Sequence, residues 1–166
     1  EGELIEATYF SCSGGRTEDA VEVWGCEYPY LKSVESPGEE VSAYYRDTVA
    51  FTPEEFGRKL GILPPEYLKE WISATEYTQA GSVRQMIIGG KTFTGTQLRS
   101  LLGLRSAAFD LDILDGEIII TTKGYGHRVG MSQYGAEAMA VLGSSYQQIL
   151  AHYYPGTEID NYGDLQ

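Results

Sequence analysis

The stretch GYGHRVGMSQYGA, residues 124–136, is the most informative part of this sequence. It follows a run of β-branched residues at 118–122 and precedes helix-forming residues at 136–142. We therefore expect a strand, a glycine loop and a helix in that order, which is a common way to present side chains and backbone N–H groups at one point. A loop that only turned the chain would not need His, Ser, Gln and Tyr together, so we interpret it as a binding or reaction site.

Within this loop, His127 is the best single candidate for a site residue. It can exchange a proton near neutral pH or donate to a sugar oxygen, and the alternative is that it organises the loop through a backbone carbonyl. Ser132, Gln133 and Tyr134 would supply neutral hydrogen bonds suited to a sugar or an N-acetyl group. Equally, Ser132 would cap the following helix while Gln133 orders the loop.

Aromatic residues are abundant, with 13 Tyr, 5 Phe and 2 Trp. Their rings can stack on sugar rings, and a tyrosine hydroxyl can also reach a sugar hydroxyl, although core packing explains most of them equally well. We assign Tyr125, Tyr134 and Trp24 to a binding groove.

Turn residues elsewhere in the chain predict two β-hairpins. One joins 83–88 to 91–93 through Gly89-Gly90, and the other joins 109–114 to 117–122 through Asp115-Gly116, a type I′ signal. Helices are predicted where an N-cap residue precedes a segment and a Gly follows it, namely at 53–60, 66–72, 94–102, 132–142 and 145–153. A short helical stretch is predicted at 17–24, and an N-terminal strand at 4–12. Because hairpins outnumber βαβ patterns, the fold class is α+β with antiparallel hairpins and several short helices in a single domain.

Composition excludes several classes of function. The chain has 166 residues, 42% of them hydrophobic, so it can bury a core. Its formal net charge of −12 argues against a nucleic-acid partner, because phosphate binding needs Lys and Arg. No apolar run approaches the 18 or so residues that would predict a transmembrane helix.

The Ser13-Gly14-Gly15 turn is a second candidate site. Its backbone N–H groups could hold an N-acetyl or carboxyl group, although a tight turn that needs positive φ at Gly14 or Gly15 explains the glycines as well. We expect the turn to line one concave surface together with the polar residues of the 124–136 stretch.

Two cysteines, Cys12 and Cys26, leave three interpretations open. They could form a disulfide, hold a zinc ion together with His127 or His152, or remain free. His152 lies near a predicted helix C-terminus, where the helix dipole favours its charged form. No cofactor is expected apart from this zinc alternative.

Two long motifs carry a resemblance to a known family. GHRVGMSQYGAEAMA (126–140) with GSSYQQILAHYYPGTEI (143–159) resembles the C-terminal signature of the stage II sporulation protein D family, which includes the amidase enhancers of bacterial cell walls. ATYFSCSGGRTEDAVEVWGCEYPYLKSVESPGEE (7–40) resembles an earlier segment of the same family. The two motifs occur in the right order and bracket the rest of the chain.

This resemblance implies a lytic transglycosylase that cleaves peptidoglycan glycan strands stripped of their stem peptides. The family's catalytic acid is a Glu in a Glu-Met-Pro motif, which this sequence lacks. We therefore expect residues 1–166 to be the C-terminal part of such a domain, with no catalytic residue of its own. Glu18, the carboxylate nearest a motif, is interpreted as a turn-capping residue.

The partners implied are peptidoglycan glycan strands and other cell-wall hydrolases, at an extracytoplasmic, membrane-anchored location in the cell envelope. The alternative is a non-catalytic wall-binding module that stimulates an amidase. A Ser-His hydrolase using Ser132 and His127 is weaker, because no orienting acid is evident and the pattern is not a nucleophile elbow.

Overall fold

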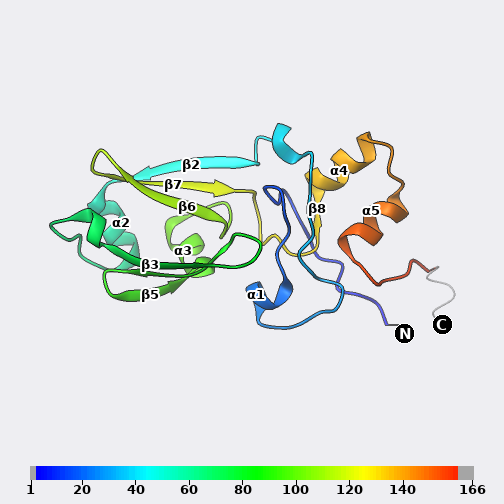
Figure 1. The fold of residues 1–166 in the computed structure, drawn as a ribbon, viewed down its shortest axis with the longest axis horizontal. Coiled ribbons are helices and arrows are strands. Elements are labelled where there is room, and N and C mark those ends of the chain that lie inside the picture. The colour runs from blue at the N-terminus through cyan, green and yellow to red at the C-terminus, as the bar shows by residue number, and fades with distance from the viewer. Residues whose placement is uncertain (1–2, 161–166) are drawn as a thin grey trace.

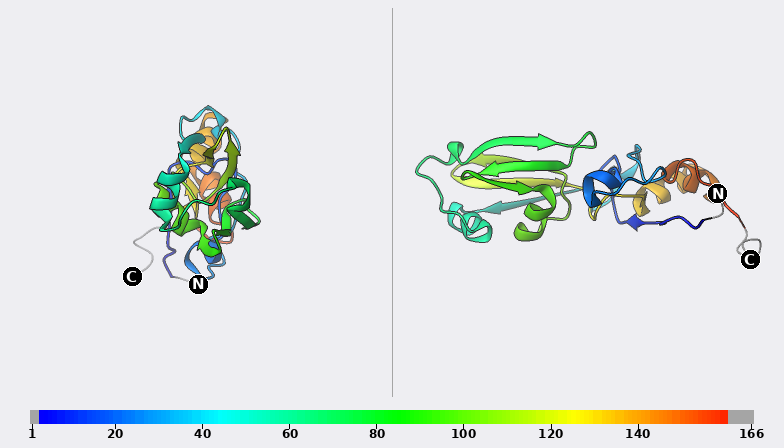
Figure 2. Two further views of the ribbon diagram at one scale, coloured as in Figure 1. Left: turned by 90° about the vertical axis from the view of Figure 1, so that its left-hand side faces the viewer. Right: turned by 90° about the horizontal axis from the view of Figure 1, so that it is seen from below.

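The computed structural model describes residues 3–160 as an elongated molecule with two halves (Figure 1). Residues 46–123 form one half, which contains two antiparallel sheets and two helices. The segments before and after them, 3–45 and 124–160, form the other half together. Both ends of the described chain, residues 3 and 160, therefore belong to the same half, and the chain crosses between the halves at each end of the central segment (Figures 1 and 2). The predicted α+β class is confirmed.

Two three-stranded antiparallel sheets form the central half. One has the order β2-β7-β6 and the other β3-β4-β5, with each neighbouring pair antiparallel. The strands are β2 (Arg46–Phe51), β3 (Ile72–Tyr77), β4 (Val83–Ile88), β5 (Lys91–Thr94), β6 (Phe109–Leu114) and β7 (Glu117–Lys123).

Both predicted hairpins are confirmed, β4 with β5 and β6 with β7. Asp115 and Gly116 have φ values of 51° and 83°, and Gly89 and Gly90 have 57° and 75°. Positive φ at both central residues is the requirement of a type I′ turn, and its twist matches that of the flanking strands.

Helix ends follow the capping residues seen in the sequence. Thr52, Thr94 and Ser145 each form a capping box with the residue three positions later, and Gly61 and Gly103 end two helices in the left-handed conformation. Four of the five helices predicted by their caps are confirmed within a residue or two, namely α2 (Pro53–Leu60), α3 (Gly95–Leu102), α4 (Gln133–Val141) and α5 (Tyr146–Tyr153).

Three predicted elements differ from the structure. The N-terminal strand is only β1 (Tyr9–Phe10), which pairs in parallel with β8 (Met131–Ser132). The predicted helix 66–72 is a single 3₁₀ turn, η2 (Leu68–Glu70), followed at once by β3. The segment from Ile72 joins the sheet because β4 offers it a ladder of backbone partners, with two register shifts, and such tertiary pairing overrides local helix propensity.

The third difference lies in the helical stretch 17–24, of which only α1 (Ala20–Trp24) is helical, with Asp19 at its N-cap. Thr17 does not cap this helix, and its hydroxyl accepts from the N–H of Val34 at 2.8 Å. Strand β2 was not predicted, because its alternation of exposed and half-buried residues carries little hydrophobic signal.

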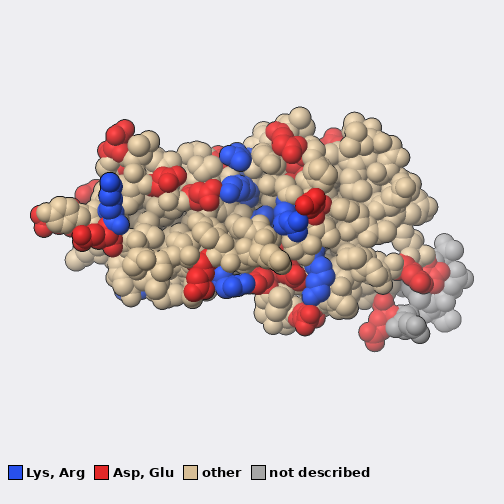
Figure 3. All heavy atoms as spheres, viewed as in Figure 1, with Lys and Arg blue, Asp and Glu red and all other residues tan. Residues whose placement is uncertain are grey.

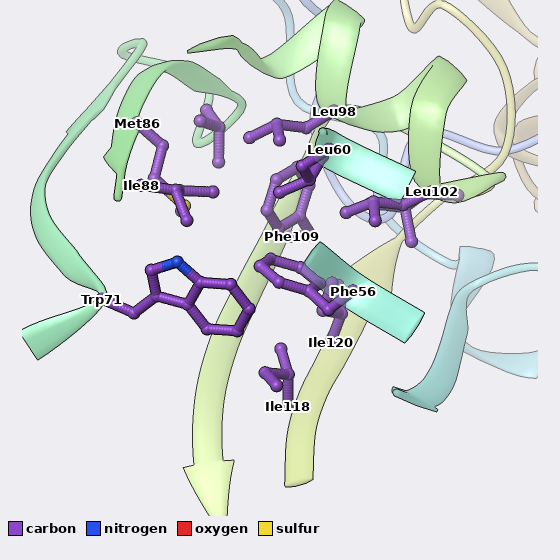
Figure 4. Packing of buried hydrophobic residues seen from close by; sticks show 12 residues of the cluster. Phe56, Leu60, Trp71, Met86, Ile88, Leu98, Leu102, Phe109, Ile118 and Ile120 are labelled. Carbon is purple, nitrogen blue, oxygen red and sulfur yellow. The ribbon is translucent and has the colours of Figure 1, made fainter. Parts of the chain in front are cut away.

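Each half has its own hydrophobic core. In the central half, Phe56 and Trp71 meet edge to face at 5.3 Å between ring centroids, over the buried side chains of β6, β7 and α3 (Figure 4). A second cluster around Leu31, Val129 and Tyr153 fills the other half. In the span 3–160, no helix is long and apolar enough to cross a membrane.

Leu98 and Leu101 of α3 offer a matched test of the central core. Leu98 is fully buried, whereas Leu101 is 43% exposed. We expect Leu98→Ala to lower the free energy of unfolding by about 2–5 kcal/mol, because it leaves a cavity, and Leu101→Ala to lower it by about 1 kcal/mol or less. Urea denaturation measures both, and equal losses would contradict this packing.

Candidate functional site

The two sequence motifs lie against each other in the structure. Cys12 and Tyr125 exchange both backbone hydrogen bonds, at 3.2 and 2.7 Å. The N–H of Glu18 donates to the carbonyl of Arg128 at 2.6 Å. Segments more than a hundred residues apart in the sequence therefore form one continuous structure at the junction of the two halves.

Close packing of glycines explains part of the motif pattern. A Cβ on Gly14 would lie 2.8 Å from the backbone N of Gly124, and a Cβ on Gly124 would lie 2.4 Å from the carbonyl oxygen of Cys12. Gly14 and Gly15 both have positive φ, 74° and 110°. The turn thus has the backbone conformation expected from its sequence, and no side chain fits where the two motifs touch.

A buried carboxylate, Glu39, holds the Ser13-Gly14-Gly15 turn in place. It lies in the 3₁₀ turn η1 (Glu39–Val41) and is completely buried. It accepts hydrogen bonds from the N–H and hydroxyl of Ser13, the N–H of Gly15 and the hydroxyls of Ser36 and Ser132. Because a buried charge is tolerated only when hydrogen-bonded, these donors and the carboxylate fix one another.

The predicted concave surface therefore does not include the side chains of Ser13 and Ser132. Both are fully buried and point to Glu39. Ser132 also caps α4 by accepting from the N–H of Gly135 at 3.3 Å, as the capping alternative supposed. Gln133 is exposed at the start of α4, and Tyr134 is half-buried.

Arg128 is the main residue that the sequence analysis missed. Its side chain is 3% exposed and its φ is 67°, which is unusual for a residue with a side chain. The guanidinium donates to the carbonyls of Ser13 at 2.8 Å, Arg16 at 2.8 Å and Ala80 at 3.2 Å, and to the hydroxyl of Ser82 at 2.7 Å. It thereby joins the N-terminal turn to the β3–β4 connection of the other half.

Glu18 is a buried partner in this junction and not merely a turn residue. One carboxylate oxygen accepts from the hydroxyl of Thr78 at 2.7 Å and lies 3.9 Å from the Arg128 guanidinium, and the other accepts from the N–H of Asp19 at 3.1 Å. Burial lowers the pKa of Arg128, and the charges of Glu18 and Glu39 oppose that shift.

His127 is half-buried between two aromatic rings. Its ring centroid lies 5.5 Å from that of Phe10 and 5.3 Å from that of Trp24, and its Nδ1 accepts from the N–H of Val129 at 3.1 Å. Burial lowers the pKa of His127, with a smaller contribution from the charge of Arg99, while a backbone hydrogen bond with Tyr9 opposes the shift. The lowered pKa favours the neutral imidazole, whose Nδ1 serves as the acceptor for the Val129 N–H.

An open groove runs beside the Gly124–Gly130 loop. Its volume is about 540 Å³, and α3 with the loop that follows it forms one wall, opposite Tyr125. A smaller enclosed cavity of about 30 Å³ adjoins His127, which is room for water and not for a sugar ring. Thr96 and Arg99 line both spaces, so the cavity and the groove are neighbours.

Aromatic rings extend the groove towards α4. The rings of Tyr44 and Tyr125 lie 5.4 Å apart, those of Tyr44 and Tyr134 lie 5.7 Å apart, and the guanidinium of Arg105 lies over Tyr44 and Tyr125 at 5.6 and 6.0 Å. Tyr125 and Trp24 keep 43% and 42% of their surface exposed. The structure thus groups Tyr125 and Tyr134 around Tyr44 at the groove, and Trp24 with His127 beside the neighbouring cavity. It adds Tyr44, Arg99 and Arg105, for which the sequence offered no signal.

Both cysteines are free thiols, so the disulfide alternative is wrong. Cys12 is buried where the two motifs meet, and burial raises its pKa to about 11, whereas Cys26 is exposed just beyond the end of α1. The zinc alternative finds no support either, since no three His, Cys, Asp or Glu side chains are grouped for a metal ion within residues 3–160. His152 instead hydrogen-bonds the carbonyl of Glu35 through Nε2 at 2.7 Å.

The two-motif arrangement is that of a known group of proteins. No protein-family model matches the chain. Stage II sporulation protein D of Bacillus amyloliquefaciens is 46% identical over 96% of the chain, and that of Bacillus subtilis (strain 168) is 43% identical over 93%. An amidase enhancer of Bacillus subtilis (strain 168) is 28% identical over 97% of the chain.

The chain is therefore a homologue of stage II sporulation protein D, as the motifs predicted. It spans about half the length of these two relatives, 46% and 45%, and 30% of the amidase enhancer. The relationship accordingly describes a part of those proteins.

Glu39 and its neighbour Glu40 allow a direct test of the buried carboxylate. Glu39→Gln keeps the shape but turns one acceptor into a donor that faces other donors, so we expect a loss of about 3 kcal/mol in the free energy of unfolding. Glu40 is exposed, and Glu40→Gln should change stability by less than about 0.5 kcal/mol. Chemical denaturation of both variants is the measurement, and a stable Glu39→Gln protein would show that the carboxylate does not organise the turn.

The lowered pKa of His127 predicts a pH dependence of stability. Below its ordinary value of 6.5 the unfolded chain binds a proton that the folded protein binds less readily, so stability falls as the pH drops through this range. We expect the wild-type protein to lose more unfolding free energy between pH 7.5 and 5.5 than His127→Gln does. His152 is present in both proteins, so its titration cancels, and identical pH profiles would contradict the prediction.

Proposed function

We propose that this chain binds glycan strands of bacterial peptidoglycan along the groove beside the Gly124–Gly130 loop. The observation that carries the proposal is the part-exposed ring of Tyr125 in the groove, packed on Tyr44 and lying beside the Arg99 and Arg105 guanidinium groups. Trp24 is a further part-exposed ring, packed on His127 at the neighbouring cavity. Such rings stack on the faces of sugars, and the donors satisfy hydroxyl, carbonyl and carboxylate oxygens at the same time. The enclosed cavity is too small for a sugar, so the strand lies in the open groove.

The relatives support a role of this kind. Two are named stage II sporulation protein D and a third is named amidase enhancer, so we infer a role related to the cell wall in sporulation. Such a role would be carried out in the cell envelope, outside the cytoplasm. This location follows from the proposed substrate.

Cleavage of the strand by a lytic transglycosylase reaction is the finer form of this proposal, and it concerns the whole protein. Glycan cleavage needs a general acid. The two carboxylates that line the enclosed cavity are already engaged, Glu18 by Thr78 and Arg128, and Glu22 by Arg84 at 2.5 and 3.0 Å. On this proposal, the 166 residues bind strands but do not cleave them by themselves.

Incubation of the chain with peptide-free glycan strands tests whether these residues cleave the strands or only bind them. We expect no anhydro-sugar product, because no Asp or Glu among residues 3–160 lines the groove as a proton donor. Clear product from the purified chain would instead assign an acid within these residues, with Glu18 the first to examine by Glu18→Gln.

A second candidate function is stimulation of a cell-wall amidase, which the match to an amidase enhancer favours. It requires contact with a second protein, whereas strand binding does not. Adding the chain to an amidase acting on intact peptidoglycan separates the two. Faster release of stem peptides, at chain concentrations where strand binding is undetectable, would favour the enhancer role.

Binding itself is tested by substitutions of the exposed rings. We expect Trp24→Ala and Tyr125→Ala each to weaken the binding of glycan strands by about tenfold, or ~1.4 kcal/mol, through the loss of a stacking surface. Tyr67 is 64% exposed and lines neither the groove nor the cavity, so Tyr67→Ala serves as the control. Co-sedimentation with purified peptidoglycan measures the affinity. Unchanged binding in both groove variants would remove the groove model.

A further inference from the structure

Of the two arginines that line the groove, Arg99 and Arg105, Arg99 has the fewer hydrogen-bond and ion-pair partners. It lies in the last turn of α3, is half-buried, and lines both the open groove and the enclosed cavity beside His127. Among residues 3–160, no carboxylate and no hydrogen-bond acceptor pairs with its guanidinium, and its electrostatic neighbour is the hydroxyl of Tyr125. The burial lowers the pKa of Arg99, yet an arginine remains charged at neutral pH.

Other arginines near the junction have their donors occupied. Arg105 pairs with Asp47 at 3.1 Å and donates to the carbonyl of Ala43 at 3.1 Å. Arg84 makes two hydrogen bonds to Glu22, and Arg128 has four acceptors. In a chain with 24 acidic and 12 basic residues, a half-buried arginine without a carboxylate partner is unexpected on charge grounds.

The surroundings of Arg99 suit an anionic group presented from the groove. Thr96 and Ser100 line the same groove and are exposed; the Thr96 hydroxyl shares a hydrogen bond with that of Thr94 at 3.0 Å, and the Ser100 hydroxyl is the neutral donor beside Arg99. Near the middle of the face in Figure 3, Lys and Arg side chains lie together with Asp and Glu side chains, whereas the surface over α4 and α5 carries few charges. A planar guanidinium binds a carboxylate through two parallel hydrogen bonds. These hydrogen bonds replace the ones to water that the guanidinium loses by burial.

We propose that Arg99 binds a carboxylate carried by the glycan strand and so makes strand recognition depend on that charge. This inference rests on the proposed function, strand binding in the same groove. Peptidoglycan offers a carboxylate from two sources, the lactyl group of N-acetylmuramic acid when no peptide is attached, and the stem peptide when one is. A neutral oligomer of N-acetylglucosamine has the same sugar backbone and neither carboxylate.

The test compares three ligands of matched length, namely N-acetylglucosamine oligomers, peptide-free glycan strands and peptide-bearing strands. We expect the wild-type chain to bind one of the two carboxylate-bearing ligands at least tenfold more tightly than the neutral oligomer. Arg99→Gln should remove that preference while leaving the affinity for the neutral oligomer unchanged. The ligand that loses affinity identifies the source of the carboxylate.

Two further variants sharpen the result. Arg58 is exposed on α2, remote from the groove, so Arg58→Gln changes the net charge by the same amount and should leave all three affinities unchanged. Arg99→Lys keeps the charge but loses the two-pronged geometry, so it should retain part of the preference. Thermal unfolding of each variant confirms that it is folded before its affinities are compared.

The outcomes separate this inference from the proposed function. A wild-type chain that binds all three ligands equally would overturn the role of Arg99 and leave strand binding intact. A loss of affinity for all three ligands in Arg99→Gln would show that the residue only shapes the groove. A wild-type chain that binds none of them would remove the proposed function, and the inference with it.

Discussion

The four hydrogen bonds of the Arg128 guanidinium are the interaction on which the junction of the two halves depends. They join the Ser13-Gly14-Gly15 turn, the carbonyl of Arg16 and the β3–β4 connection, which belong to different halves. Arg128 can reach all of them because its backbone adopts φ of 67°, a conformation that costs about 1–2 kcal/mol for a residue with a Cβ. Without this side chain, several buried carbonyl groups would lose their donor, so the groove and cavity at the junction depend on it.

Glu39 plays a comparable role within the half that contains the termini. Its carboxylate gathers two serines of the sequence motifs, Ser13 and Ser132, and the hydroxyl of Ser36, which in turn lies 2.5 Å from that of Tyr153. Polar motif residues that looked like ligand-binding groups in the sequence are thus the buried support of the site. The side chains left at the groove include the ring of Tyr125 and Arg99, with the ring of Tyr44 packed on Tyr125.

The distribution of charge bears on which kind of ligand the groove can bind. The chain is strongly acidic, with a formal net charge of −12, and would repel an anionic polymer at most of its surface. Local cations beside stacking rings are then a means of binding a strand that is largely neutral and carries separated carboxylates. Arg105 is committed to Asp47, whereas Arg99 keeps its donors for such a group, at least among residues 3–160.

Capping residues, turn glycines and hairpin dipeptides determined α2 to α5 and both hairpins from the sequence alone, because these signals act within a few residues. The sequence also placed Tyr125, Tyr134, Trp24 and His127 near a site, through two motifs that resemble one family. Only the tertiary structure decided that Ser13 and Ser132 are buried, that the segment from Ile72 is a strand, that Arg99 lines the groove and that Tyr44 packs on Tyr125. Such features arise from contacts between residues distant in the chain, and the local pattern of any one segment does not encode them.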